Sequence, residues 1–285
     1  MNVARDQEWR GEPLSREEEG FPARDALPSR PPTQMLPDPA PALRLTGIGR
    51  RFGALHAVRD VTLTVAAGER RAVLGPNGAG KTTLFNLVCG DIPPSEGRIA
   101  FFGADITHLP PHRRTRLGIG RTYQTSLLFN GLGVLDNLYL AVRGGRPGRF
   151  SFRRPGRGDP DLARARALAE RMRLAHVAER PVADLSHGQR RQLEVGMALA
   201  CDPKVLMLDE PAAGLSPGDR PELLALLKGL PRSLTLVLVE HDMDVALPAS
   251  DVVTVMKDGA IAVEAPPDRI GSDPVVQAIY LGGGH

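Results

Sequence analysis

The sequence predicts an α/β fold with a mostly parallel central sheet, and three short apolar runs carry that prediction. Residues 205–208 are continuously apolar and 234–239 are apolar except for Thr235, as expected of parallel strands that are covered on both faces. Residues 71–74 form a third run, which a glycine-rich loop and the apolar helical pattern of 84–88 follow directly. A strand, a tight loop and a helix in succession are typical of α/β proteins.

The first 41 residues differ in composition from the rest of the chain. They combine three consecutive glutamates at 17–19, scattered arginines and many prolines, so little in them can form a hydrophobic core. The sequence therefore predicts a disordered arm over residues 1–41 and a folded domain over 42–285. Binding of a partner by the arm is the alternative to a bare extension.

Half-buried strands open the folded domain. Residues 43–45 and 61–65 alternate between apolar and polar side chains, and a further strand at 97–103 is bounded by glycines. These strands are expected to form an antiparallel β subdomain beside the parallel core. Near the C-terminus, Asp258-Gly259 predicts a type I′ turn between strands at 252–256 and 260–263.

A helical subdomain is expected at about 126–186. Two basic, glycine-rich stretches at 144–149 and 153–158 interrupt its helical pattern. We predict solvated loops there, and contact with anionic lipid head groups is the alternative.

Composition and charge exclude several classes of protein. Of the 285 residues 42% are hydrophobic, and no run approaches the roughly 18 apolar residues of a membrane span. The first residues lack the apolar core of a signal peptide, so a cytoplasmic location is expected. The net charge is +3 and the arginines are dispersed along the sequence, so the charge does not indicate nucleic-acid binding. Cys89 and Cys201 lie in apolar helical patterns and are expected to be buried, reduced thiols.

A phosphate-binding loop is predicted directly after the strand at 71–74. The spacing Gly-x-x-x-x-Gly-Lys-Thr between a strand and a helix is that of a P-loop, whose backbone N–H groups converge on phosphate. The helix that starts there directs the positive end of its dipole at the same point. Lys81 would neutralise the outer phosphates and Thr82 would offer a hydroxyl to Mg²⁺. The predicted ligand is a nucleoside triphosphate, and the candidate residues are Gly75, Pro76, Asn77, Gly78, Ala79, Gly80, Lys81, Thr82 and Thr83.

An acidic pair, Asp209-Glu210, follows the apolar run 205–208. The carboxyl end of a parallel strand opens where the P-loop opens, so we expect the pair to face the phosphates. Asp209 is expected to hold the Mg²⁺ shell, and Glu210 to orient or deprotonate the water that attacks the γ-phosphate. The alternative is a solvated strand end that Pro211 terminates.

A second capped helix start lies upstream of this pair. Ser186 and Gln189 have the spacing of a capping box, with Gly188 between them. A plain helix start explains part of this pattern, but a helix N-terminus is also a phosphate-binding device.

With these motifs, residues 43–285 resemble the ATP-binding cassette (ABC) family. The segment Leu185–Gln189 resembles its signature motif, with His187 in place of the usual first glycine. The resemblance implies that two ATPase subunits meet head to tail, and that each ATP lies between one P-loop and the other chain's signature helix. Ser186 and Gly188 would then contact the γ-phosphate across the interface, and Gln189 belongs to the same predicted ATP-binding set.

The resemblance also implies roles for residues outside these motifs. Phe52 falls where the family has an aromatic that stacks on adenine, and an ordinary core aromatic is the alternative. Gln124 matches the glutamine that senses Mg²⁺ and the attacking water, and His241 matches the switch histidine. Residues 213–216 stand where the family has a dimer-contacting loop, although Ser216 replaces its closing aspartate. The predicted catalytic residues are therefore Glu210, His241 and Gln124, and the predicted Mg²⁺ residues are Thr82, Gln124 and Asp209.

Segments 120–124, 210–217, 240–245 and 273–282 look like one branch of the family, the ATPases of branched-chain amino acid and urea importers. This narrower resemblance implies a subunit on the inner face of the cell membrane that powers import of branched-chain or other hydrophobic amino acids, amides or urea. The implied partners are transmembrane permease subunits and a second ATPase subunit, identical or related. Direct binding of the transported solute or of nucleic acid is not expected. Apolar residues 127–129 would help to receive a permease helix, and simple core packing is the alternative.

Three other functions remain as alternatives. One is the ATPase of a lipid or lipopolysaccharide exporter, whose cassette is similar. Another is a soluble ABC ATPase of DNA repair or ribosomes, but there is no room for a long coiled coil between Lys81 and Ser186, and no second cassette. A small-molecule kinase would not need the signature helix.

Overall fold

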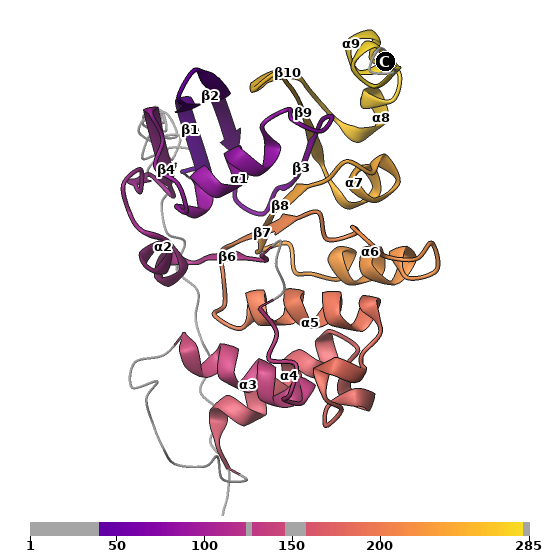
Figure 1. Cartoon of the computed structure of the whole chain (residues 1–285). Coiled ribbons are helices and arrows are strands. Elements are labelled where there is room, and N and C mark those ends of the chain that lie inside the picture. The colour runs from indigo at the N-terminus through magenta and orange to yellow at the C-terminus, as the bar shows by residue number, and fades with distance from the viewer. Residues whose placement is uncertain (1–39, 124–126, 146–157, 282–285) are drawn as a thin grey trace, which may run out of the picture. The chain divides into compact units, whose positions relative to one another are not determined.

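The computed structural model describes residues 40–123, 127–145 and 158–281, all of which belong to one compact unit, Pro39–His285 (Figure 1). The predicted arm, residues 1–41, lies almost entirely outside the described residues, so its boundary stays a prediction. Within the described ranges, no helix is long and apolar enough to cross a membrane.

A six-stranded sheet forms the centre of this unit, with the strand order β10-β9-β3-β8-β7-β6. Neighbouring strands are parallel throughout, except that β10 is antiparallel to β9, which confirms the predicted mostly parallel sheet. The strands are β3 (Arg70–Leu74), β6 (Ile119–Arg121), β7 (Val205–Asp209), β8 (Thr235–Val239), β9 (Val252–Lys257) and β10 (Ala260–Ala265).

A smaller antiparallel sheet has the order β2-β1-β4-β5, as predicted for the β subdomain. Its strands are β1 (Leu43–Phe52), β2 (Leu55–Val65), β4 (Glu96–Phe101) and β5 (Ala104–Asp105). β1 and β2 are longer than the alternating runs predicted, because their distal halves continue past the buried, alternating section into an exposed hairpin.

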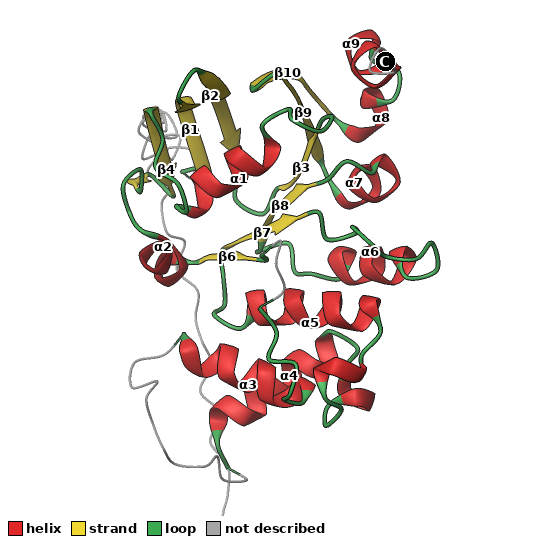
Figure 2. Cartoon of the chain, in the orientation of Figure 1, coloured by secondary structure: helices red, strands yellow, loops and turns green. Residues whose placement is uncertain are grey.

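Helices separate the two sheets and cover the far face of the larger one (Figure 2). In Figure 1, α1 lies between the smaller sheet and the main sheet. The helices are α1 (Lys81–Cys89), α2 (Pro111–Leu117), α3 (Val134–Gly144), α4 (Pro160–Arg171), α5 (His187–Leu199), α6 (Arg220–Lys228), α7 (Met243–Ala249), α8 (Pro267–Ile270) and α9 (Pro274–Leu281), with 3₁₀ turns at Ala175–Val177 and Val182–Asp184.

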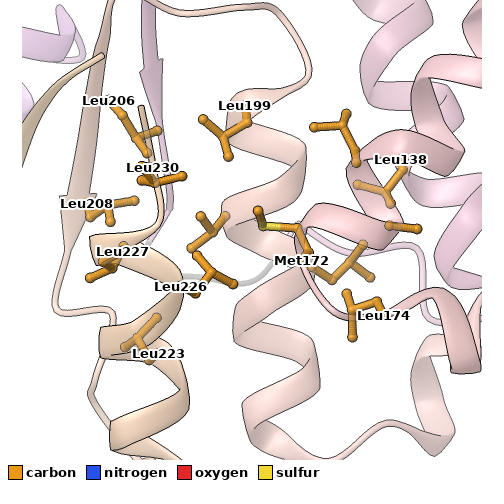
Figure 3. Packing of buried hydrophobic residues seen from close by; sticks show 14 of the residues in the cluster. Leu138, Met172, Leu174, Leu199, Leu206, Leu208, Leu223, Leu226, Leu227 and Leu230 are labelled. Carbon is orange, nitrogen blue, oxygen red and sulfur yellow. The ribbon is translucent and has the colours of Figure 1, made fainter. Parts of the chain in front are cut away.

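Strand β7 shows why continuously apolar runs predicted a sheet covered on both faces. Leu206 and Leu208 point to one side, where they pack with leucines of α6 and with Leu199 of α5 (Figure 3). Val205 and Met207 belong instead to the cluster around α1 and the smaller sheet. Alternate side chains of a strand face opposite sides, so both sides must be apolar to be buried.

On the far side of α5, the same core continues into the helical layer of α3 and α4. Leu138, Met172 and Leu174 pack there, and Figure 3 shows α5 lying between them and the β7–α6 side. Helix α5 is therefore held by apolar contacts on two sides, which fixes the position of its N-terminus.

The predicted turn after β9 is confirmed. Asp258 and Gly259 both have positive φ, 49° and 82°, and the flanking strands pair in antiparallel register. Two successive left-handed residues are what a type I′ turn requires.

Candidate nucleotide-binding site

A cavity of about 720 Å³ opens above the N-terminus of α1. It brings Lys81 together with Glu210, which lies at the carboxyl end of β7 and is remote from Lys81 in sequence. The lining residues are Ala54, Leu55, His56, Ala57, Arg59, Asn77, Gly78, Ala79, Gly80, Lys81, Thr82, Thr83, Glu210 and Asp258. Seven of the nine predicted loop residues, Asn77 to Thr83, thus line one cavity with the predicted acidic residue Glu210.

The loop between β3 and α1 follows a path that requires glycine at Gly80. This residue is the N-cap of α1 with a φ of 97°, and a side chain there would collide with the carbonyl oxygen of Ala57 in β2. The left-handed backbone and the close approach both exclude a Cβ atom. The start of α1, with its unpaired N–H groups, therefore faces the cavity directly.

Lys81 is 5% exposed, and its ammonium group lies within the loop itself. Its Nζ atom donates to the carbonyl oxygens of Gly75 at 2.7 Å and Pro76 at 3.1 Å, so these two predicted residues hold the lysine instead of lining the cavity. Burial lowers the pKa of Lys81, and three nearby carboxylates, foremost Glu210, oppose that shift. The result is a buried positive charge aimed at the place where anionic groups would bind.

Asp209 closes β7 and is 2% exposed. Its N–H donates to the hydroxyl of Thr122 at 3.3 Å, and the N–H of Thr122 donates to the carbonyl of Met207 at 3.1 Å. Gln124, two residues after Thr122, lies outside the described residues. Its role therefore stays a prediction.

Glu210 and His241 come together from neighbouring strand ends. Glu210 follows β7, and His241 lies two residues beyond the end of β8, which pairs in parallel with β7. His241 Nδ1 lies 3.7 Å from Glu210 Oε1, so a small molecule or a single water can contact both side chains. The parallel register thus brings these two predicted catalytic residues to the same edge of the sheet.

A buried carboxylate, Glu240, lies directly beside this pair. Its side chain is fully buried, Oε1 accepts the N–H of Ala212 at 2.9 Å, and Oε2 accepts the N–H of His241 at 3.2 Å. Burial raises the pKa of Glu240, and the hydrogen bonds from these N–H groups partly offset that effect. Nothing in the local sequence distinguishes Glu240 from an ordinary strand-end residue.

The predicted capping box at the start of α5 is present. The hydroxyl of Ser186 accepts the N–H of Gln189 at 3.2 Å, and the side-chain oxygen of Gln189 accepts the N–H of Ser186 at 3.1 Å. Gly188 lies against Asp219, and a Cβ atom there would be 3.2 Å from the Asp219 carboxyl carbon. Among the described residues, Ser186, Gly188 and Gln189 do not line the P-loop cavity of their own chain.

His187 contacts the loop at 213–216. Its Nε2 atom lies 3.3 Å from the carbonyl oxygen of Ala213, and it would collide with a side chain at Gly214. Ser216, where a closing aspartate was expected, donates its hydroxyl to Asp219 at 2.7 Å. The two segments that the resemblance places at a dimer interface are therefore adjacent in one chain.

Phe52 does not line the cavity with the other described residues. Its ring is 45% exposed, so it is not a core aromatic, and the Arg50 guanidinium lies 4.5 Å from the ring centroid. Residues just beyond it, Leu55 to Ala57 in β2, line the cavity instead. Stacking of Phe52 on a base stays a prediction.

Sequence reasoning missed the side of the cavity formed by β2 and the β9–β10 turn. Arg59 in β2 donates through Nε to the carbonyl of Asp258 at 2.8 Å, and its N–H donates to the carbonyl of Gly259 at 2.7 Å. The Asp258-Gly259 turn was visible in the sequence, but no local pattern indicated that it would meet β2.

Comparisons with known proteins agree with this geometry. A family model described as ABC transporter matches residues 58–213. The high-affinity branched-chain amino acid transport ATP-binding protein BraF of Pseudomonas aeruginosa is 37% identical over 252 residues, covering 85% of this chain and 98% of BraF. The ADP conformation of MJ1267, an ATP-binding cassette of an ABC transporter, is similar with a TM-score of 0.76 and 31% identity, covering 85% of this chain and 99% of that one. A dimeric structure of MJ0796, a bacterial ABC transporter cassette, has a TM-score of 0.67 and 25% identity, covering 79% of this chain and 98% of that one.

Proposed function

The chain belongs to the ABC transporter family, and from that membership we propose that it hydrolyses ATP to power an importer of branched-chain amino acids or similar solutes. ATPase activity is that of the family. The solute is inferred from BraF, a branched-chain amino acid transport protein that this chain matches over 98% of the length of BraF. Other hydrophobic amino acids, amides and urea belong to the same proposal. The exporter and soluble alternatives are not favoured by these relatives.

One observation supports the catalytic part of the proposal most directly: a single cavity holds the buried ammonium of Lys81 and the carboxylate of Glu210. The α1 N-terminus and Lys81 would bind the triphosphate, and Glu210 would accept a proton from the attacking water. His241, 3.7 Å from Glu210, would contact the γ-phosphate and keep that water in line. Leu55, His56 and Ala57 of β2 extend the cavity on the side where a base and ribose would lie.

The residues present are suited to Mg²⁺. The hydroxyl of Thr82 lines the cavity and the carboxylate of Asp209 ends β7 behind it, and both offer the hard oxygen atoms that Mg²⁺ prefers. Among the described residues, no group of three or more His, Cys, Asp or Glu side chains could hold a metal by itself. This agrees with an ion that enters bound to nucleotide phosphates. When bound, Mg²⁺ would neutralise phosphate charge.

The capped start of α5 is proposed to act on a second ATPase subunit. Ser186, Gly188 and Gln189 lie outside the P-loop cavity of their own chain, but their helix N-terminus suits a phosphate. A facing subunit would present its P-loop ATP to this surface. The dimeric structure of MJ0796 supports such pairing in a related cassette.

A second surface is proposed to receive the permease. A groove of about 210 Å³ between β6 and helices α3 and α5 is lined by Tyr123, Leu127, Leu128 and Met197, among others. Leu127 and Phe129 are more than half exposed, so they are not core residues, whereas Leu128 is partly buried and packs against the core. Such a groove suits an apolar helix of a membrane subunit and would hold this chain on the inner face of the membrane.

Co-purification from the native membrane, followed by reconstitution, tests the transport part of the proposal. We expect permease subunits to accompany the full-length chain, and leucine or a similar solute with its binding protein to stimulate ATP hydrolysis by the complex. Purification with ribosomes or DNA, or stimulation by lipid alone, would contradict an amino-acid importer.

A further inference from the structure

Glu240 is a fully buried carboxyl group that the proposed chemistry does not use. It does not line the P-loop cavity, and its oxygens accept backbone N–H groups of Ala212 and His241. A carboxylate removed from water costs stability unless several donors compensate it. Its presence at this point therefore calls for a role other than stability.

Both N–H groups belong to segments that carry the proposed catalytic side chains. Ala212 lies two residues after Glu210, on the turn that leaves β7, and its N–H is 2.9 Å from Glu240 Oε1. His241 follows Glu240 directly, and its N–H is 3.2 Å from Oε2. One rigid carboxyl group thus joins the ends of two neighbouring strands.

The geometry of the catalytic pair depends on those segments. The His241 imidazole lies 3.7 Å from Glu210 Oε1 and 4.0 Å from Glu240 Oε2. Glu210 has a φ of 45°, and its N–H donates to the carbonyl of Val239 in β8 at 2.8 Å. A shift of the Ala212 segment away from β8 would turn the Glu210 side chain away from the imidazole.

We propose that Glu240 is a positioning residue for ATP hydrolysis, which bridges the Ala212 and His241 backbones and so fixes the separation of the Glu210 and His241 side chains. The proposal rests on the proposed function of Glu210 and His241. It adds a residue that acts through both of them and that does not itself line the P-loop cavity.

Positioning and mere structural support predict different results for the neutral isostere. Glu240→Gln keeps the size of the side chain and one carbonyl oxygen, and it removes the buried charge. Removal of that costly charge offsets the loss of one hydrogen bond, so the variant is expected to be about as stable as the parent chain. In glutamine one of the two oxygen positions becomes an NH2 group, which donates and cannot accept, so one of the two N–H groups loses its acceptor and the bridge is broken.

The test compares Glu240→Gln and Glu240→Ala with the parent in the full-length chain, by kcat, KM for MgATP and thermal unfolding. We expect kcat to fall about tenfold or more for Glu240→Ala, less for Glu240→Gln, and KM to change less than about twofold. The melting temperature of Glu240→Gln should not fall. Asp251→Asn is a matched control, because its carboxylate accepts the N–H of Arg70 at the opposite end of β3. The Asp251→Asn substitution should lower the melting temperature and leave kcat unaltered.

Full kcat in both Glu240 variants beside an inactive Glu210→Gln chain would overturn the role of Glu240 and leave the proposed function intact. A loss of kcat in Glu240→Gln that merely follows a lower melting temperature would overturn it too. By contrast, normal hydrolysis by Glu210→Gln would contradict the proposed function itself. The two failures are therefore distinguishable.

Discussion

Glu210 has a backbone conformation that residues with a side chain rarely adopt, and its neighbours hold it there. Its φ is 45°, its N–H is bonded to Val239, and its carbonyl accepts the guanidinium of Arg191 in α5 at 2.9 Å. Strain of this kind persists where the surrounding structure over-determines it, as at functional sites. The backbone of Glu210 is thus held by two separate segments of the chain, β8 and α5.

The buried ammonium group of Lys81 provides a prediction on ATP affinity. Lys81→Met removes a buried cation that, among the described residues, donates hydrogen bonds to two loop carbonyls, and burial of that cation is itself costly, so the folded chain should remain stable. Affinity for ATP should fall about tenfold or more, because a charge-assisted contact to phosphate is lost. Titration calorimetry with nucleotide measures this change. Lys228→Met, on the exposed end of α6, is the control and should bind ATP normally.

Glu240 provides a prediction on pH and stability. Burial raises the pKa of this carboxyl above its ordinary value of 4.5, so the folded chain retains a proton that the unfolded chain has released. Its contribution to stability therefore decreases as pH rises from about 4.5 through the folded pKa, by up to about 1.4 kcal/mol per pH unit. Glu240→Gln should be nearly as stable as the parent at about pH 4.5 and more stable than the parent at higher pH. Urea unfolding at about pH 5 and about pH 8 checks the sign, and an advantage that shrinks at the higher pH would refute it.

At the scale of elements, α1 is fixed at both ends by different means. Its N-terminus is fixed by the loop that packs on Ala57, and its last turn by Arg114 of α2, which is 1% exposed. The Arg114 guanidinium donates to the carbonyls of Leu87 and Val88, both at 2.7 Å. It also bonds the carbonyls of Thr107 and Leu109, so a single side chain satisfies four acceptors.

Arg114→Met should therefore be strongly destabilising. Four carbonyl groups would lose the Arg114 guanidinium as a donor, three of these bonds being buried, and we expect a loss of about 3–5 kcal/mol in the free energy of unfolding. Chemical denaturation measures it. Arg113→Met, an exposed neighbour on the same helix, is the matched control and should change stability by less than about 0.5 kcal/mol. Equal effects of the two substitutions would show that the carbonyl contacts do not stabilise α1.

The capped start of α5 provides a prediction that separates folding from function. Ser186→Ala removes a cap, which typically costs about 1 kcal/mol. Asp159→Ala removes the equivalent cap of α4, whose side chain accepts the N–H of Asp161. Both variants should lose similar stability, but only Ser186→Ala should lower the ATPase rate at saturating protein, because only that helix would contact ATP. Equal ATPase rates would exclude the role proposed for Ser186.

At the scale of the whole molecule, the sequence predicted those features that short stretches specify. The loop Asn77 to Thr83, the Ser186 capping box and the Asp258-Gly259 turn depend on neighbours within a few residues, and all three are present. The apolar runs predicted the parallel strands β7 and β8. Since the carboxyl ends of both strands lie at the same edge of the sheet, Glu210 and His241 lie close together. Three-residue β6 is too short to give a periodic signal.

The missed features depend on contacts between distant segments. Arg59 meets Asp258 across 199 positions, and Glu240 meets Ala212 across 28. No local pattern encodes such contacts, because they depend on which strands and turns lie side by side in the folded chain.

The central claim is that Glu210 drives ATP hydrolysis in a site that another subunit completes. Its most direct test is steady-state phosphate release by the parent chain and by Glu210→Gln with MgATP, with the oligomeric state of each measured in parallel. We predict that Glu210→Gln binds ATP, loses at least about 99% of the parent rate, and forms an ATP-dependent dimer. Rapid hydrolysis by Glu210→Gln, with no ATP-dependent association of the chains, would contradict the account.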